Sequence, residues 1–149
     1  GIEALEGPQD KVNEMVAIFR ERRDAIVDGL NAIDGFKCLR PKGAFYVFPN
    51  IGGVCESLGA IEAFEKLPED ARDQSSPSTL FQMFLLFKYH VATMDRRSFG
   101  KIGHEGKHFL RLSIATGIDD LREGVKRIDE ASKDRDGFAA YLESGDPLF

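Results

Sequence analysis

The chain has 149 residues, of which 42% are hydrophobic and 30% are charged, and its formal net charge is −5. This composition is that of an acidic globular chain of about one domain, long enough to bury a core without a disulfide or a metal. The acidic balance argues against a nucleic acid or a membrane surface as partner, because both require a basic face.

Targeting signals and cysteine content point to one compartment. The longest apolar run, at residues 83–87, is far shorter than the roughly 18–20 residues that span a bilayer. The first residues lack the basic and apolar regions of a signal peptide. Cys38 and Cys55 are too few for a disulfide framework and favour free, buried thiols in a reducing compartment. These features predict a cytoplasmic protein.

Residues 8–34 predict one long helix. Pro8 suits a first helical position, apolar residues recur every three or four positions from Val12 to Ile33, and Gly35 suits a left-handed end. At 1.5 Å per residue the helix would be roughly 40 Å long. Because few small domains need so long a helix, residues 1–35 are expected to form a helix of the kind that joins two domains.

Short strands and helices alternate between residue 36 and the C-terminus. Ser76 and Pro77 are the expected N-cap and first residue of a helix, and residues 116–119 resemble a capping box. Composition and periodicity predict, in chain order, a strand at 36–39, a strand at 44–48, a helix at 57–66, a loop at 69–78, a helix from 76 to 89, a strand at 91–94, a loop at 95–107, a strand at 108–115, a helix at 118–132 and a C-terminal helix within 133–149.

The expected architecture is therefore α+β. It is a two-layer α/β sandwich with a long N-terminal helix and a small, mostly antiparallel sheet that helices cover on one side. Residues 1–149 would form a single domain, with residues 36–132 as the sandwich and residues 133–149 as its C-terminal helix and tail.

Arg111 is the clearest candidate for a binding residue. In the strand 108–115 the aliphatic side chains at positions 110, 112 and 114 share one face, so Arg111 lies on the other face, with Phe109 and Ser113. A planar guanidinium on a strand matches the two oxygens of a carboxylate. The alternative is a solvent-exposed strand arginine that binds nothing.

Residues 104–108 contain a literal H-E-x-x-H motif. On a helix, His104 and His108 would bind zinc, with Glu105 beside the metal-bound water. Gly103 and Gly106 flank and interrupt this segment, and a strand follows it, so coincidence is the favoured explanation and no metal is expected. A zinc hydrolase that uses these three residues stays open as an alternative function.

No catalytic acid, base or nucleophile accompanies the candidate anion receptor, which is typical of half an active site. Five short stretches then occur in a particular order, namely LEGPQ at 5–9, PKGAFY at 41–46, VATM at 91–94, SFG at 98–100 and LRLSIA at 110–115. In this order they resemble the C-terminal, small domain of the fold-type-I pyridoxal-phosphate aminotransferases, the class I/II or aspartate aminotransferase family.

The resemblance implies a role for three residues. Arg111 would bind the α-carboxylate of an amino-acid substrate, Phe45 would lie at the site entrance, and Phe99 would belong to a loop beside the site. The activity implied is the transfer of an amino group from an amino acid to a 2-oxo acid, by a homodimer that uses pyridoxal 5′-phosphate.

The resemblance also implies what this chain lacks. In the family, the Schiff-base lysine and the other cofactor-binding residues belong to the preceding large domain, which is absent from these 149 residues. The chain is therefore expected to be a fragment without catalytic or cofactor-binding residues, to bind no cofactor and to be inactive alone. Its partner would be the large domain of the same polypeptide.

The loop before Phe99 departs from the family pattern. Asp95, Arg96 and Arg97 stand where the family has a proline followed by a glycine, so the shape of this loop is open. Lys101 follows Ser98 at the spacing seen around the Schiff-base lysine, but its place in the segment order argues against that role. A non-catalytic interaction domain of the same fold is the second alternative function.

Overall fold

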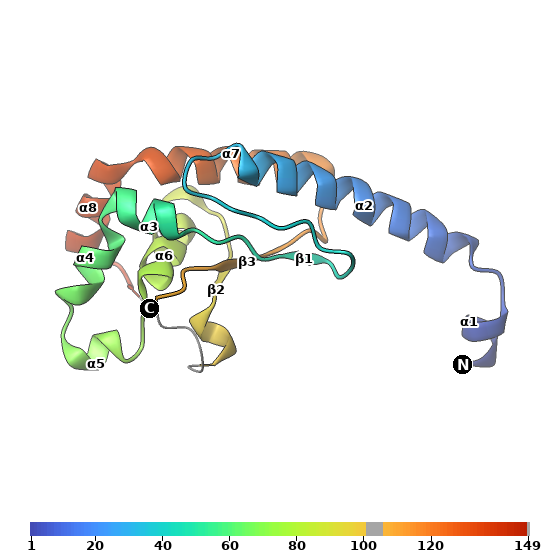
Figure 1. The fold of residues 1–149 in the computed structure, drawn as a ribbon, viewed down its shortest axis with the longest axis horizontal. Coiled ribbons are helices and arrows are strands. Elements are labelled where there is room, and N and C mark those ends of the chain that lie inside the picture. The colour runs from blue at the N-terminus through green and yellow to red at the C-terminus, as the bar shows by residue number, and fades with distance from the viewer. Residues whose placement is uncertain (101–105, 149) are drawn as a thin grey trace.

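Three short strands lie at the centre of the computed structural model, and helices pack around them while one long helix projects to the N-terminus (Figure 1). The structure describes residues 1–100 and 106–148. In chain order the elements are α1 (Ile2–Glu6), α2 (Asp10–Asn31), β1 (Tyr46–Val47), α3 (Gly52–Leu58), α4 (Ala60–Glu65), α5 (Glu69–Arg72), α6 (Pro77–Tyr89), β2 (Met94–Asp95), the 3₁₀ turn η1 (Arg97–Phe99), β3 (Leu110–Ser113), α7 (Ile118–Lys133) and α8 (Arg135–Glu143).

The sheet has the strand order β1-β3-β2, and both pairings are antiparallel. β3 is the central strand, with Tyr46 opposite Ser113 and Met94 opposite Arg111. Leu110 and Leu112 are buried on one face, and the side chains between and after them are more exposed. The α+β class and the antiparallel sheet are confirmed.

The two long helices, α2 and α7, run side by side along one side of the molecule (Figure 1). Only the C-terminal half of α2 is buried, through Ile26, Val27 and Leu30. The backbones approach closely at Gly29, because a Cβ there would lie 2.9 Å from a methyl group of Val125. The N-terminal half of α2 projects beyond the body, and its apolar residues are about half exposed (Val12, Met15, Val16 and Ile18).

α6 forms the middle of the core, as its apolar circumference predicts. Phe81, Phe84 and Leu85 have no solvent exposure, and the ring of Phe84 packs against Phe138 and Tyr141 of α8. The helix begins as predicted, because the Ser76 hydroxyl accepts the backbone N–H of Thr79 at 3.1 Å. This N-cap fixes the start of the helix beside the site described below.

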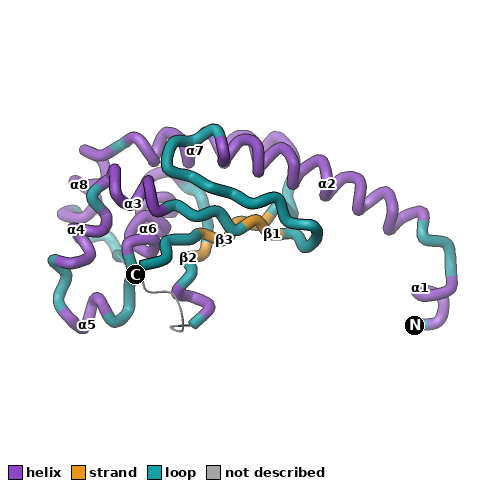
Figure 2. The backbone as a smooth tube through the Cα atoms, in the orientation of Figure 1, coloured by secondary structure: helices purple, strands orange, loops and turns teal. Residues whose placement is uncertain are grey.

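The predicted strand at 36–39 is wrong. Only Lys37 forms a β-bridge, with Asn50, and most of the segment between α2 and β1 is loop (Figure 2). The Asn31 side chain donates to the carbonyl of Cys38 and accepts its N–H, at 2.9 and 2.8 Å. Because this amide satisfies both backbone groups, Cys38 needs no partner strand.

Helix boundaries also differ from the predictions. The helix expected at 57–66 is two helices, α3 and α4, because Gly59 takes a left-handed conformation with φ +77° between them. The capping box at 116–119 is wrong, since Gly117 is the N-cap and the Thr116 hydroxyl donates to the Asp120 side chain at 2.9 Å instead. The sequence missed α1 and also α5, which lies within the predicted loop 69–78.

The remaining elements match in type with shifted ends. The long helix spans Asp10–Asn31, and Gly35 is left-handed in the turn that follows it. The strand expected at 44–48 is reduced to β1, because Ala44 is left-handed at φ +66°. The strand expected at 91–94 is reduced to the two residues of β2, which begins three residues later at Met94, since the chain first leaves α6 through left-handed His90.

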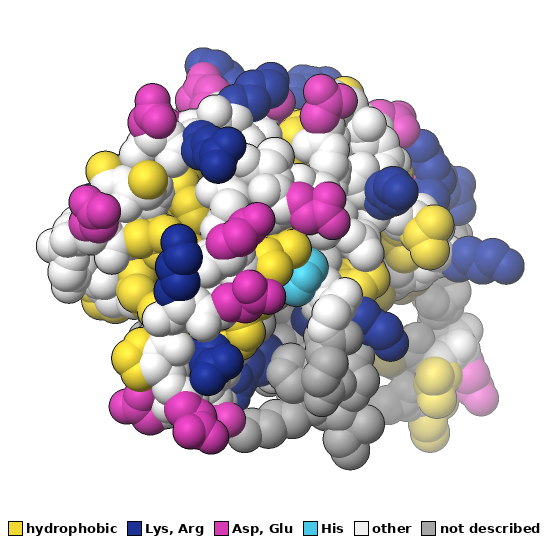
Figure 3. Space-filling model, turned by 60° about the vertical axis from the view of Figure 1, so that its left-hand side comes forward, with side chains coloured by type: hydrophobic (Ala, Val, Ile, Leu, Met, Phe, Trp, Pro, Cys, Tyr) yellow, Lys and Arg dark blue, Asp and Glu magenta, His cyan; other side chains and the backbone are white. Residues whose placement is uncertain are grey.

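The surface is polar and mixed in charge where Figure 3 shows it. Over the described part of that face, acidic and basic side chains are interspersed and hydrophobic side chains appear between them. A nucleic acid requires a continuous basic field, which that face does not offer. Among the described residues, no helix has the length and apolarity needed to cross a bilayer.

Candidate functional site

Arg111 lies at the centre of β3 on the face opposite the buried leucines of that strand. Its guanidinium carbon is 4.3 Å from the ring centroid of Tyr46 and 4.7 Å from that of Phe99. The nitrogen Nη2 lies 2.8 Å from the thioether sulfur of Met94, the residue opposite on β2. Two cation–π contacts and one strand neighbour therefore hold the guanidinium in place.

The charge of Arg111 is not neutralised inside the described part of the chain. No carboxylate of residues 1–100 or 106–148 lies within ion-pair distance of it, whereas Arg23, Arg40 and Arg127 each form such a pair. One N–H of the guanidinium is directed at the Met94 sulfur, and the other N–H groups are left for an incoming anion, of which a carboxylate can accept two in parallel. This geometry suits a carboxylate receptor.

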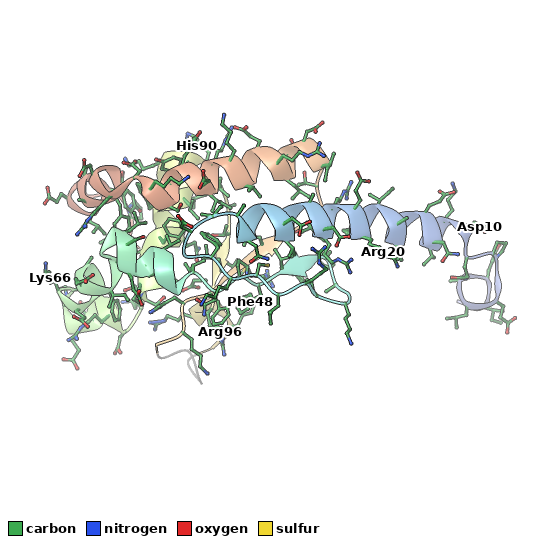
Figure 4. All side chains as sticks on the ribbon, turned by 45° about the horizontal axis from the view of Figure 1, so that its top comes forward. Asp10, Arg20, Phe48, Lys66, His90 and Arg96 are labelled. Atoms are coloured by element: carbon green, nitrogen blue, oxygen red, sulfur yellow. The ribbon has the colours of Figure 1, made fainter. Side chains whose placement is uncertain are left out.

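Aromatic side chains frame the receptor. Phe48 stacks on Phe109, with centroids 5.3 Å apart, and meets Phe99 edge to face at 6.3 Å. Figure 4 shows Phe48 below the α2–α7 layer, in the same part of the molecule as Arg96. The frame is open to solvent, since exposure is 39% for Phe48, 37% for Met94 and 46% for Phe99. An open apolar frame excludes water only when something covers it.

Phe45 is connected to this frame through its neighbour. Its ring packs against Tyr46 with centroids 4.1 Å apart, and it also lines a cavity of about 400 Å³ between α2 and the loop 42–45. Apolar residues of α2, including Met15 and Phe19, form the other wall, and Arg20, which Figure 4 labels on the projecting half of the helix, lies at the same cavity.

The structure therefore brings two of the three predicted residues, Arg111, Phe99 and Phe45, into direct contact. Arg111 and Phe99 are in direct contact, and Phe45 reaches Arg111 only through Tyr46. The sequence missed Tyr46 and Met94. Tyr46 carries a signal, because it belongs to the same GAFY stretch as Phe45, but Met94 is found only from the register of β2 on β3.

Asp95 ends β2 and is buried, with 2% exposure. One carboxylate oxygen accepts the Ser98 backbone N–H at 3.0 Å and its hydroxyl at 2.5 Å. The other accepts the hydroxyl of Thr79 and, at 3.5 Å, that of Ser76. The residue that departs from the family pattern thus organises the loop that carries Phe99.

The structure leaves the zinc hypothesis untested, because only one of its three residues, His108, is among those described. His104, Glu105 and also Lys101 lie outside them. His108 leads into β3, its carbonyl accepts the N–H of Ile51 at 2.8 Å, and burial lowers the pKa of its imidazole. Within residues 1–100 and 106–148, no three His, Cys, Asp or Glu side chains gather into a group that could hold a metal.

Comparison with known proteins identifies the family. The sequence model described as aminotransferase class I and II matches residues 1–128. Aspartate aminotransferase of Rhizobium meliloti (strain 1021) is 39% identical over 130 residues, which cover 87% of this chain and 28% of that protein. A probable aspartate/prephenate aminotransferase of Aquifex aeolicus is 39% identical over 132 residues, which cover 87% of this chain and 28% of that protein.

Solved structures agree with the sequence comparison. The crystal structure of the Rhizobium meliloti aspartate aminotransferase superposes with a TM-score of 0.64 at 35% identity, covering 88% of this chain and 29% of that chain. Alanine aminotransferase from Pyrococcus furiosus gives 0.65 at 29% identity, covering 89% and 28%. The chain belongs to the class I and II aminotransferase family, and it spans little more than a quarter of the length of these relatives. Membership implies pyridoxal phosphate as the cofactor of the full-length proteins.

Proposed function

We propose that this chain is the C-terminal, small domain of an aminotransferase and that Arg111 binds the α-carboxylate of the amino-acid or 2-oxo-acid substrate. The observation that carries the proposal is a guanidinium on the central strand that contacts two rings and has no carboxylate partner among the described residues. Both substrates of an amino-group transfer carry a carboxylate beside the reacting carbon, so one receptor serves both half-reactions.

The groups that contact Arg111 do not supply the amine that the cofactor needs. They are the rings of Tyr46 and Phe99 and the thioether of Met94, and none of them can form an imine. When bound in the full-length protein, pyridoxal phosphate supplies the electron sink for amino-group transfer. The residues of this chain would bind the substrate's carboxylate, orient the molecule and, once the aromatic frame is covered, exclude water from it.

The large domain of the same polypeptide is the proposed cover. Residues 1–35 would join the two domains, and the projecting half of α2 has apolar side chains about half exposed, as an interface awaiting its partner would. We propose a homodimer for the complete protein and the cytoplasm as its compartment, where the buried thiols of Cys38 and Cys55 would stay reduced. The 149-residue chain alone would be inactive.

The test compares the complete polypeptide with the 149-residue chain in an assay of amino-group transfer. Activity is expected only in the complete polypeptide, and Arg111→Ala should lower its kcat/KM at least about 100-fold, while Arg111→Lys, which keeps the charge but loses the paired N–H groups, should lower it about 10-fold. Full activity of Arg111→Ala would favour a non-catalytic interaction domain. One tightly bound zinc per chain, lost in His104→Ala, would favour the hydrolase.

A further inference from the structure

Phe99 contacts Arg111, but burial does not fix its ring. The side chain is 46% exposed, and its recorded ring partners are the guanidinium at 4.7 Å and Phe48 at 6.3 Å. The position of the ring therefore depends on the backbone of η1, the 3₁₀ turn that carries it. Whatever holds that turn also decides whether one ring contact of the guanidinium is made.

Asp95 and Arg97 fasten the turn to α6 and to the chain segment just before it. Asp95, immediately before it, accepts hydrogen bonds from Thr79 and from both the backbone and the hydroxyl of Ser98. The backbone N–H of Asp95 donates to Gln82 at 2.7 Å. Within the turn, the Arg97 guanidinium donates to the carbonyl of residue 75 at 2.8 Å. The buried helix α6 thereby holds the exposed turn η1 in place.

The carboxylate of Asp95 is the centre of this anchor. It is 2% exposed, and no cation lies within ion-pair distance of it in the described residues, so hydroxyl and backbone donors alone compensate its burial. Each of these donors contributes to stability, because a carboxylate oxygen that is buried without a hydrogen-bond donor costs the full free energy of removing it from water. The loop must therefore keep Ser98 and the first turn of α6 directed at Asp95.

We propose that Asp95 is a positioning residue for Arg111. Its carboxylate fixes the turn 97–99 against α6, so that Phe99 stays on the guanidinium and leaves the N–H edge of Arg111 directed at the substrate's carboxylate. The part of this inference that concerns the carboxylate rests on the proposed function. The part that concerns the packing of Phe99 on Arg111 does not.

The first experiment measures the packing in the 149-residue chain. Asp95→Asn keeps the size of the side chain but removes its charge, which weakens the hydrogen bonds that it accepts from Ser98 and Thr79. Nuclear Overhauser contacts between the Phe99 ring and the Arg111 side chain should weaken in Asp95→Asn and stay unchanged in Asp136→Asn, an exposed acid on α8. Unchanged contacts in Asp95→Asn would overturn the proposal. If Asp95→Asn does not fold, Ser98→Ala removes one hydroxyl donor and should weaken the same contacts.

The second experiment uses the complete aminotransferase and a readout that general destabilisation does not move. The ratio of kcat/KM for an amino acid to that for its carboxamide reports how well the enzyme recognises the carboxylate. Asp95→Asn should lower this ratio about 10-fold, the effect of one weakened charge-assisted hydrogen bond. Ile128→Val, which trims a buried side chain of α7, should leave it unchanged.

The two experiments distinguish a failure of the positioning role from a failure of the proposed function. An unchanged acid-to-amide ratio in Asp95→Asn overturns the positioning role even when the wild-type enzyme is active. A complete wild-type polypeptide without amino-group transfer overturns the proposed function, and the contacts between Phe99 and Arg111 then decide the structural part of the inference alone.

Discussion

Replacing Arg111 by methionine should separate binding from stability. The two ring contacts, with Tyr46 and Phe99, are each worth about 0.5–1 kcal/mol at an exposed site. Methionine keeps an unbranched stem, and its sulfur regains about 0.3–1.5 kcal/mol against the same rings. No carboxylate of the described residues is left unpaired by the change. The free energy of unfolding should therefore fall by about 1 kcal/mol or less, which lowers the Tm of a chain this long by no more than about 2–4 °C.

The neighbouring residue on β3 supplies the control. Leu110 has no solvent exposure, so Leu110→Ala should lower the free energy of unfolding by about 2–5 kcal/mol through lost burial and the cavity left behind. Urea unfolding followed by circular dichroism measures both variants in the 149-residue chain. If Arg111→Met costs as much as Leu110→Ala, the arginine is part of the structural framework, and its assignment as a free carboxylate receptor is refuted.

Three further predictions concern stability alone. Asp134→Ala removes the N-cap of α8 and the acceptor of the Tyr89 hydroxyl, so urea unfolding should show a loss of about 2–3 kcal/mol, and Asp134→Asn, which can still cap, should lose less. Burial, and next the hydrogen bond to Asp134, raises the pKa of Tyr89 to about 12, and burial raises the pKa of Tyr141 to about 12. The stability that these two neutral phenols contribute is complete below their ordinary pKa near 10, and the free energy of unfolding should fall as the pH rises toward 12. This fall should be shallower in Tyr89→Phe. Gly35→Ala would place a Cβ 2.6 Å from a backbone nitrogen of α3 at φ +86°, so urea unfolding should show a loss of about 2 kcal/mol or more. Gly124→Ala on α7, with open space around it, should gain up to about 1 kcal/mol in the same assay.

The elements that the sequence predicted well are those whose signals are local. The Ser76 hydroxyl caps a backbone N–H three residues away, so both ends of that contact are visible in the sequence. The burial of α6 follows from its apolar circumference. The face of Arg111 follows from the alternation along β3. In each case the deciding interaction is made within a few residues of the signal.

The errors came from contacts between distant or unexpected groups. The strand at 36–39 failed because an amide side chain, Asn31, satisfies the backbone of Cys38, and no propensity scale contains that pairing. The site was incomplete for a similar reason. Met94 adjoins Arg111 only through the strand register, and the burial of Asp95 depends on donors from α6, whereas a charged loop residue is ordinarily exposed.

A row of rings connects the projecting half of α2 to Arg111, the proposed carboxylate receptor. The cavity of about 400 Å³ beside α2 is lined by Phe45, which packs on Tyr46, which in turn packs on Arg111. Phe99 continues this row on the same guanidinium. If the large domain proposed above filled the cavity beside α2 and also covered Phe99, it would exclude water from the apolar frame. Exclusion of water strengthens the attraction between a guanidinium and a carboxylate. Docking and carboxylate binding would therefore favour each other.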